Sequence, residues 1–311
     1  MIELNKIYNE DCLEGMKRIP DGSVDMILCD LPYGTVKNMR LDGWIEGSTY
    51  WDSVIDICVL FENYNRILKE NGAVILFSQE PFTSSLRKQK HNNVVFSYPL
   101  IWLKDHFANP FNAKRAPVSY FEDISVFRKK YDTQNLNPLR RYIRDILDYV
   151  GFKSSMQINK ALGHQRADHT FRVGSTQFKL CTEETYSEMV QTFKLESMVG
   201  YKPYSELERM IVSFNPTFNI PDGNKHYSNV LDFKKDYTGL HPTQKPVALF
   251  EHLIRTYTNE NETVLDNCMG SGTTAIAAIN TNRNFIGFEL DETYHTVANE
   301  RIANHLTERG D

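Results

Sequence analysis

Residues 24–34 read VDMILCDLPYG, an apolar run that ends in an acid, a proline, an aromatic residue and a glycine. The apolar part is typical of a short buried strand, and the turn Pro20-Asp21-Gly22 bounds it upstream. Asp30 and Tyr33 therefore stand where a strand ends, which is where open α/β sheets bind ligands. There a carboxylate can accept the N–H of a flat ring while the aromatic side chain stacks on it. A plain strand and turn, with Tyr33 in the core, would give the same short pattern.

Strand and helix patterns alternate on both sides of this stretch. Apolar runs predict strands at residues 6–9, 73–77, 94–103, 124–127, 263–266 and 284–289. Helical spacing of apolar residues predicts helices at residues 13–19, 52–68 and 247–257, with a long polar loop at 34–51. This order of elements predicts an α/β fold with a mixed, mostly parallel sheet.

The pattern changes between residues 129 and 235, where basic and aromatic residues increase and helical patterns replace strands. Helices are expected at residues 138–149, 154–163, 164–172 and 182–195. The second and third of these are separated by Gly163, a spacing typical of a helix-turn-helix as well as of an ordinary helical hairpin. We therefore predict an inserted, mainly helical domain at 129–235, between the two parts of a main domain at 1–128 and 236–311.

Charge is distributed unevenly along the chain. The net charge is −5, yet residues 128–179 carry eleven Lys and Arg against four Asp and Glu, which is +7 and leaves −12 elsewhere. A basic segment on an acidic body can dock a polyanion such as DNA, although a solvated basic surface is the commoner meaning. The candidate DNA-binding residues are Arg140, Arg141, Arg144, Gln165, Arg166, His169 and Arg172.

Composition limits the class of protein further. The hydrophobic content of 41% and the charged content of 24% are typical of a soluble globular protein. We expect no membrane span, because no apolar stretch is long enough to cross a bilayer, and no signal peptide, because the sequence starts with MIELN. The five cysteines are scattered and form no CxxC pair, which fits a reducing cytoplasm and argues against structural zinc, so no metal site is expected.

A glycine loop follows the strand expected at 263–266. Residues 266–274 read DNCMGSGTT, a small-residue helix comes next, and the strand after it ends at Glu289. Glycines let the backbone approach a ligand closely, and an acid about twenty residues further on commonly binds ribose hydroxyls. No Lys follows the second glycine and no third glycine follows at dinucleotide spacing, which disfavours nucleoside triphosphates and NAD. A nucleoside cofactor without pyrophosphate fits, such as S-adenosylmethionine, although a structural turn remains the alternative.

Three stretches together resemble the amino-methylating DNA methyltransferases: DLPY at 30–33, HPTQKP at 241–246 and VLDNCMGSGTT at 264–274. The catalytic motif comes first, the recognition domain lies in the middle, and the cofactor loop comes last. This is the order of the circularly permuted beta class. The resemblance covers residues 1–128 and 236–311. It implies a Rossmann-like methyltransferase fold, an inserted DNA-recognition domain and S-adenosylmethionine as the cofactor.

The resemblance also implies a role for each matching residue. The residues matching the catalytic Asp-Pro-Pro-Tyr motif are Asp30, Leu31, Pro32 and Tyr33. Leu31 departs from that motif, but only its carbonyl oxygen is used. The implied cofactor-binding residues are Asp11 at the adenine, Glu289 at the ribose, Gln244 and Lys245 near the methionine carboxylate, and Asp266, Gly270, Gly272 and Thr273 in the loop. Residues 267–269 read NCM where Pro-Phe-x is usual, which loosens the loop assignment.

The implied activity is methyl transfer to the N6 amino group of an adenine that is flipped out of duplex DNA at a specific site. Asp30 favours adenine, because cytosine-N4 enzymes more often begin the motif with Ser; cytosine N4 stays an alternative. A non-catalytic DNA-binding regulator on the same scaffold is another, although the intact acid and loop speak against it. The expected partner is double-stranded DNA, with a homodimer and a cognate restriction endonuclease left open. The expected location is the cytoplasm, at the nucleoid, for a bacterial or phage-encoded protein.

Overall fold

The structure is a computed structural model of the 311-residue chain. It describes residues 2–34, 54–89, 91, 93–108, 114–129, 138–175, 177–214, 216–221, 223, 225–236 and 244–310. The chain divides into two compact units. The first, here called the sheet unit, holds residues 1–130 and 216–311, and the second, the helical unit, holds residues 131–215.

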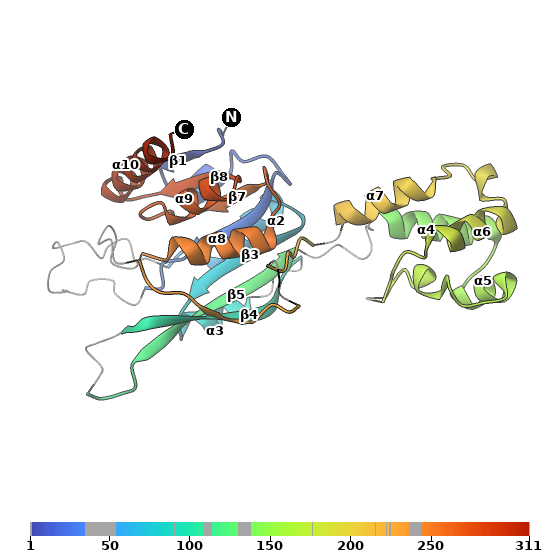
Figure 1. Cartoon of the computed structure of the whole chain (residues 1–311), viewed down its shortest axis with the longest axis horizontal. Coiled ribbons are helices and arrows are strands. Elements are labelled where there is room, and N and C mark those ends of the chain that lie inside the picture. Colours follow the sequence, from blue (N-terminus) through green and yellow to red (C-terminus); the bar gives the residue numbers. More distant parts are fainter. Residues whose placement is uncertain are drawn as a thin grey trace. The chain divides into compact units, whose positions relative to one another are not determined.

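The described strands of the sheet unit form one sheet in the order β1-β8-β7-β2-β3-β5-β4-β6 (Figure 1). Their bounds are β1 Lys6–Asn9, β2 Val24–Asp30, β3 Leu68–Ser78, β4 Val94–Ala108, β5 Ser119–Lys129, β6 Val230–Asp232, β7 Thr263–Asp266 and β8 Asn284–Glu289. Every neighbouring pair is parallel except the two that include β5. The predicted α/β fold with a mixed, mostly parallel sheet is confirmed.

Two strand pairs bring distant parts of the chain together. At the edge, β1 pairs with β8, from Lys6 beside Ile286 to Asn9 beside Glu289. Near the centre, β2 pairs with β7, with Met26 beside Val264. The strand that carries Asp30 and the strand that precedes the glycine loop are therefore neighbours and run in the same direction. Their carboxyl ends lie at the same edge of the sheet, as the permuted order of the motifs requires.

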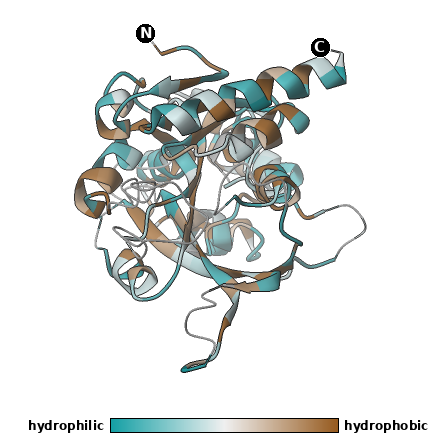
Figure 2. Ribbon diagram, turned by 90° about the vertical axis from the view of Figure 1, so that its left-hand side faces the viewer, coloured by the Kyte–Doolittle hydropathy of each residue, from teal (hydrophilic) through white to brown (hydrophobic). Residues whose placement is uncertain are grey.

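Helices cover both faces of the sheet because its strands alternate apolar side chains between them (Figure 2). Met26 and Leu28 face a core shared with the helices α8 Val247–Tyr257, α9 Thr273–Asn280 and α10 Glu292–Arg309. Ile27 and Cys29 face a second core shared with α1 Cys12–Met16, α2 Ile57–Ile67 and α3 Phe82–Lys88. No helix in the part of the chain that the structure describes is both long and apolar enough to cross a membrane.

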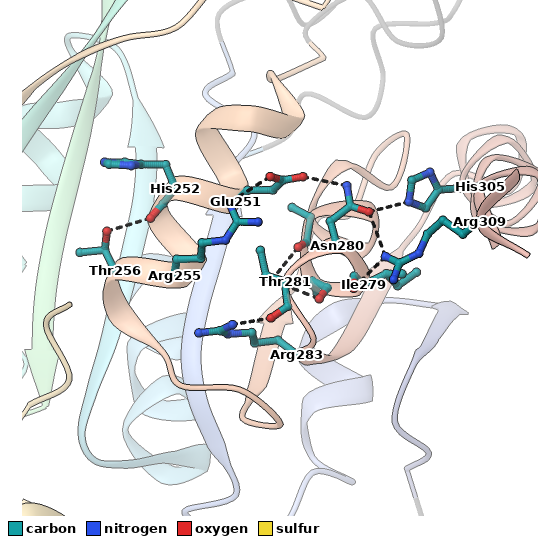
Figure 3. Close-up of polar contacts among 12 residues, drawn as sticks. Glu251, His252, Arg255, Thr256, Ile279, Asn280, Thr281, Arg283, His305 and Arg309 are labelled. Atoms are coloured by element: carbon teal, nitrogen blue, oxygen red, sulfur yellow. Dashed lines mark hydrogen bonds and ion pairs between the residues drawn. The ribbon is translucent and has the colours of Figure 1, made fainter. Parts of the chain in front are cut away.

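Polar contacts connect α8, α9 and α10, the three helices that share the first core (Figure 3). The Asn280 side chain at the end of α9 donates to Glu251 of α8 at 2.7 Å and contacts His305 of α10 at 2.6 Å. Arg309 of α10 also donates to the carbonyl of Ile279 at 3.2 Å. These contacts hold α9, and with it the glycine loop at its start, against both neighbouring helices.

The helical unit has a hydrophobic core of its own. It contains α4 Pro138–Val150, α5 Ser155–Leu162, α6 Glu183–Phe193, α7 Tyr204–Phe214 and two short 3₁₀ helices, η2 Asp168–Phe171 and η3 Leu195–Ser197. The inward stripe of α4 includes Leu139, Ile143 and Ile146, which belong to the same core as Met189 of α6. Helix α7 was not among the predicted helices.

The structure corrects two sequence-based predictions. The helix expected at 164–172 is only the four-residue η2, because its backbone hydrogen bonds span three residues, as from Thr170 to Ala167, and not four. The helix-turn-helix interpretation is therefore wrong. The compact helical unit also ends at residue 215 and not at 235, because Val230–Asp232 joins the sheet as β6 beside β4. The predicted loop 34–51, apart from Gly34, and residues 241–243 of HPTQKP lie outside the described residues.

Candidate active site

Asp30 and Tyr33 form the first half of the site. Asp30 is the last residue of β2, and the Tyr33 hydroxyl donates to its Oδ1 at 2.5 Å. The Tyr33 ring stacks on Phe82 of α3 with ring centroids 5.9 Å apart. Because one ring face contacts Phe82, a flat ligand can stack only on the opposite face. Leu31 between them is buried, which fixes the backbone of the motif.

Lys245 connects Asp30 to the start of α9. Its ammonium donates to Asp30 Oδ2 and lies 3.3 Å from Glu122 Oε2. Its backbone carbonyl accepts the Thr273 hydroxyl at 3.4 Å. The resemblance places Gln244 and Lys245 near the methionine end of the cofactor. Both are buried, and the Lys245 ammonium points to the catalytic-motif acid.

The glycine loop forms the second half of the site. Gly272 is the N-cap of α9 with a φ of +83°, and Gly270 has a φ of +54°, conformations that favour glycine. The Gly270 N–H donates to Glu289 Oε2 at 2.7 Å, and the Asp291 N–H donates to the other oxygen at 2.9 Å. The ends of β7 and β8 are thereby joined at Glu289.

Asp266 and Arg301 support the loop from behind. Asp266 is buried and accepts the Thr274 hydroxyl and, at 3.0 Å, the Cys268 N–H. Burial raises the pKa of Asp266 to about 6. Arg301 of α10 donates to the Ser271 carbonyl at 3.1 Å and to the Thr273 hydroxyl at 3.2 Å. Nothing in the sequence pattern had singled out Arg301.

Asp11 lies at the carboxyl end of β1, at the same edge as the other site residues. It is exposed, and its Oδ1 accepts the Leu13 N–H at 2.8 Å and the Glu14 N–H at 3.3 Å as the N-cap of α1. Capping accounts for this residue without a ligand. The adenine contact that the resemblance implies for Asp11 therefore stays a prediction.

The site has the features that a nucleoside cofactor with a positive charge requires. A Cβ built on Gly270 meets no atom within 4 Å, so there is open space beside the loop. Glu289 still has lone pairs for ribose hydroxyls, since a carboxylate oxygen that accepts one backbone N–H can accept a further donor. The carboxylates of Asp30 and Glu289 suit a cationic ligand. Among the described residues, no group of three or more His, Cys, Asp or Glu side chains could hold a metal ion.

Two charged residues of the site escaped the sequence analysis. Lys104 of β4 and Glu122 of β5 pair at 2.9 Å, and Glu122 also reaches Lys245. A signal was present in the alternation, because Lys104 continues the inward series of Leu100 and Trp102. A charge in an inward position of an apolar strand indicates a buried partner.

The candidate DNA-binding residues separate into two groups. Arg140 donates to the carbonyls of Val173 and Ser175 and lies 4.5 Å from the Phe178 ring centroid, so it holds the unit together. The paired residues are Arg166 with Glu188 at 3.0 Å, Arg172 with Asp168 at 2.6 Å, and His169 with the Gln177 carbonyl at 3.0 Å. Arg141, Arg144 and Gln165 are exposed, and neither arginine has an ion pair within the described part of the chain.

The sheet order and the site together define a class. An acid and an aromatic residue stand at the end of β2, the glycine loop follows its neighbour β7, Glu289 ends β8, and β1 pairs with β8 at the edge of the sheet. This is a circularly permuted, Rossmann-like methyltransferase. The model of the DNA methylase family, the N6/N4 methyltransferases, matches residues 24–300. The chain belongs to this family and is a DNA methyltransferase.

Individual proteins agree with the family. The chain is 26% identical to DNA adenine methyltransferase YhdJ of Escherichia coli K12 over 310 residues, covering 98% of this chain and 85% of that protein. It is 24% identical to the type II methyltransferase M.HindIII of Haemophilus influenzae, covering 95% and 94%. Among solved structures, the M1.HpyAVI–SAM complex matches with a TM-score of 0.52 at 23% identity, covering 95% and 98%. The cytosine-N4-specific PvuII DNA methyltransferase matches with a TM-score of 0.53 at 14% identity, covering 97% and 91%.

Proposed function

We propose that the chain is a site-specific methyltransferase that methylates the N6 amino group of an adenine flipped out of duplex DNA. The main support is the position of Lys245, whose side chain binds Asp30 and whose backbone binds Thr273 beside the glycine loop. The base-binding and cofactor-binding halves thus share one residue. Adenine is favoured by Asp30 at the start of the motif and by the likeness to a relative named as an adenine methyltransferase.

The site residues can do the chemistry that amino methylation requires. The adenine amino nitrogen is a poor nucleophile, because its lone pair is delocalised into the ring. Asp30 and the Leu31 carbonyl accept its two N–H groups, which returns electron density to the nitrogen and aligns it for attack. The ring face of Tyr33 that points away from Phe82 receives the flipped base and replaces part of the lost stacking. S-adenosylmethionine, the family's methyl donor, supplies a methyl group on a positively charged sulfur.

The cofactor is held by the chain's own residues around the loop. Glu289 binds the ribose hydroxyls, and the Gly270 backbone leaves room for the ligand. Asp266 and Arg301 keep the loop in place, and Thr273 opens α9. The position at the carboxyl ends of β7 and β8 is the usual one for a nucleoside in this type of sheet.

The helical unit serves as the target-recognition domain. Helix α5 supports this, because Ile158 is its only buried residue and it contains no acid. Its exposed residues include Gln157 and Lys160, and Arg141 and Arg144 are exposed on α4. The basic residues contact phosphates, and Gln157 and Lys160 read base edges. A homodimer, a cognate restriction endonuclease and a location at the bacterial nucleoid stay predictions.

One assay tests the proposed function. The protein is incubated with tritiated S-adenosylmethionine and plasmid DNA from a host that lacks DNA methylation, and the DNA is then digested to nucleosides and analysed by mass spectrometry. We expect N6-methyladenine. N4-methylcytosine would overturn the adenine assignment and keep the reaction class. No methylation, together with no S-adenosylmethionine binding by calorimetry, would favour the regulator.

A further inference from the structure

Four charged side chains, three of them buried and that of Asp30 partly exposed, follow one another with alternating sign. Lys104 pairs with Glu122 at 2.9 Å, Glu122 with Lys245 at 3.3 Å, and Lys245 with Asp30. The row has its least exposed side chain at one end, Lys104 with 0%, and its most exposed at the other, Asp30 with 22%. The row therefore leads from the closed interior to the carboxylate that faces the substrate.

Strand register places the row on one face of the sheet. Asp30 lies beside Phe77 of β3, Phe77 beside Ile124 of β5, and Glu122 beside Trp102 of β4. Side chains alternate along a strand, so Asp30, Glu122 and Lys104 share the face that packs against α8. Lys245 reaches the same face because it stands two residues before α8.

Burying these charges costs free energy, which a purely structural element would avoid. Taking charges out of water is unfavourable, and apolar side chains of similar size would commonly stabilise a sheet as well or better. The ammonium groups are partly compensated by aromatic rings, Lys104 at 5.7 Å from the Trp102 centroid and Lys245 at 5.5 Å from the Phe77 centroid. Buried charges beside a reactive group are typical of functional sites.

We propose that Glu122 and Lys104 are positioning residues for methyl transfer, acting through Lys245. Two acids and two lysines make the row electrically neutral. Lys245 pairs with both Asp30 and Glu122. The Asp30 carboxylate therefore stays charged, and its ion pair with Lys245 does not prevent it from accepting a hydrogen bond from the substrate. The amino group of the substrate can then bind Asp30 while Lys245 remains paired with Glu122. This inference rests on the proposed function only for its effect on turnover.

The electrostatics of the row agree with this arrangement. Burial raises the pKa of Asp30, and Lys245 opposes that rise. Burial also acts to raise the pKa of Glu122, but Lys245 and Lys104 outweigh it and leave this pKa below its ordinary value. The other groups near Asp30 are Tyr33, Cys29 and Asp266, and Lys235 lies near Lys104.

The proposal is tested by the titration of Asp30 in the free protein. The protein is labelled with ¹³C at the aspartate carboxyls, and the Asp30 signal is identified by its absence in Asp30→Asn. Glu122→Gln leaves the row with an excess positive charge, so the titration midpoint of Asp30 falls by about one pH unit. Lys104→Met leaves an excess negative charge, so the midpoint rises by a similar amount. The double variant restores neutrality, and its midpoint returns close to that of the wild type.

A matched control is available in the same sheet. Lys69 pairs with Asp25 at 2.6 Å near the start of β3, far along the sheet from Asp30, so Lys69→Met removes an ion pair without touching the row. In Lys69→Met the titration midpoint of Asp30 stays at the wild-type value. Shifts of the same sign in Glu122→Gln and Lys104→Met, or no shift in either, overturn the proposal. Thermal unfolding confirms that each variant is folded at the temperature of the titration.

Turnover gives the second readout. Glu122→Gln lowers kcat for methyl transfer, because Lys245 then pairs with Asp30 alone, while the Kd for S-adenosylmethionine measured by calorimetry is unchanged. An unchanged kcat in a folded Glu122→Gln protein would also overturn the proposal. Should the wild type methylate no DNA, the proposed function fails, and the titration still decides whether the row sets the charge of Asp30.

Discussion

Asp30 already has two donors, the Tyr33 hydroxyl and the Lys245 ammonium, on its two carboxylate oxygens. A substrate amino group must therefore join this set or replace one member of it. That makes the two oxygens unequal, since one is held by a neutral hydroxyl and the other by a cation. Substitutions at Asp30 and at Tyr33 separate the contribution of the carboxylate from that of the hydroxyl that donates to it.

Asp30→Ala removes the acceptor for the amino group. We expect methyl transfer to fall by at least about a hundredfold, the scale for the loss of one preorganised polar contact to a reacting group. Binding of S-adenosylmethionine and of DNA should remain, because neither the loop nor the helical unit changes. Initial rates with tritiated cofactor, calorimetry and DNA gel shifts measure the three quantities. Full methyl transfer by this variant would rule out the assigned role.

Tyr33 combines two functions that two variants can separate. Tyr33→Phe removes the hydrogen bond to Asp30, and we expect about a tenfold loss in kcat/KM, since bonds to charged groups contribute about 1.5–3 kcal/mol. Tyr33→Ala also removes the ring and should lose more. Equal losses in the two variants would show that the ring does not stack on the base.

Asp266 gives the protein a stability that depends on pH. Its pKa is raised from 3.8 to about 6 in the folded state, so the folded protein binds this proton more tightly than the unfolded chain. Stability therefore falls as pH rises from about 4 to about 6, by roughly 3 kcal/mol at most for this group. Asp266→Asn should flatten that slope. Urea unfolding of both proteins at several pH values between 4.5 and 7.5 measures the difference, and identical slopes would contradict the assignment.

At the level of elements, the strands of the site were predictable and their cross-strand partners were not. Residues 26–29 and 73–77 are continuous apolar runs, so their burial follows from composition alone. The Lys104–Glu122 pair depends on the register between β4 and β5, which a single sequence does not reveal. The end of helix α5 at Gly163 was also predicted correctly. The next helix was not, because the inward spacing of Ala167, Thr170 and Phe171 can belong to a short 3₁₀ helix as well as to an α-helix.

The glycine loop allows a controlled test of the cofactor site. Gly270 and Gly22 have almost the same backbone, with φ values of +54° and +58°, and a Cβ built on either meets nothing within 4 Å. Alanine at either position should cost about 1–2 kcal/mol of stability through backbone strain. Only Gly270→Ala also fills the space beside the loop, so only this variant should weaken S-adenosylmethionine binding, by about tenfold or more. Calorimetry compares the two, and equal weakening in both would argue against a cofactor beside Gly270.

At the level of the whole molecule, the described residues form three hydrophobic cores that share no buried residue, two in the sheet unit and one in the helical unit. The core of the helical unit draws on α4, α5, α6 and α7, with a buried Tyr142–Tyr186 hydroxyl pair at 2.6 Å. The insert as such was predictable from its change in composition. Its C-terminal boundary was not, because the three residues of β6 give no pattern of their own and depend on β4 for pairing.

A fragment of residues 131–215 should therefore fold without the rest of the chain. Domains of this size commonly hold a sufficient core. We expect a helical circular dichroism spectrum, a cooperative thermal transition, and DNA binding that weakens steeply with salt. Arg141→Gln with Arg144→Gln should reduce that binding, whereas the paired Arg166 should matter less. A fragment that folds and does not bind DNA would exclude the helical unit as an independent DNA-binding module.

The pairing of β1 with β8 has a consequence for synthesis on the ribosome. Asn9 and Glu289 meet across 280 residues of chain, so β1 has no partner in the sheet until β8 has been made. The catalytic motif is translated before its cofactor loop. On the proposed function, a nascent polypeptide that carries Asp30 therefore cannot bind the methyl donor until Gly270 and Glu289 have left the ribosome as well.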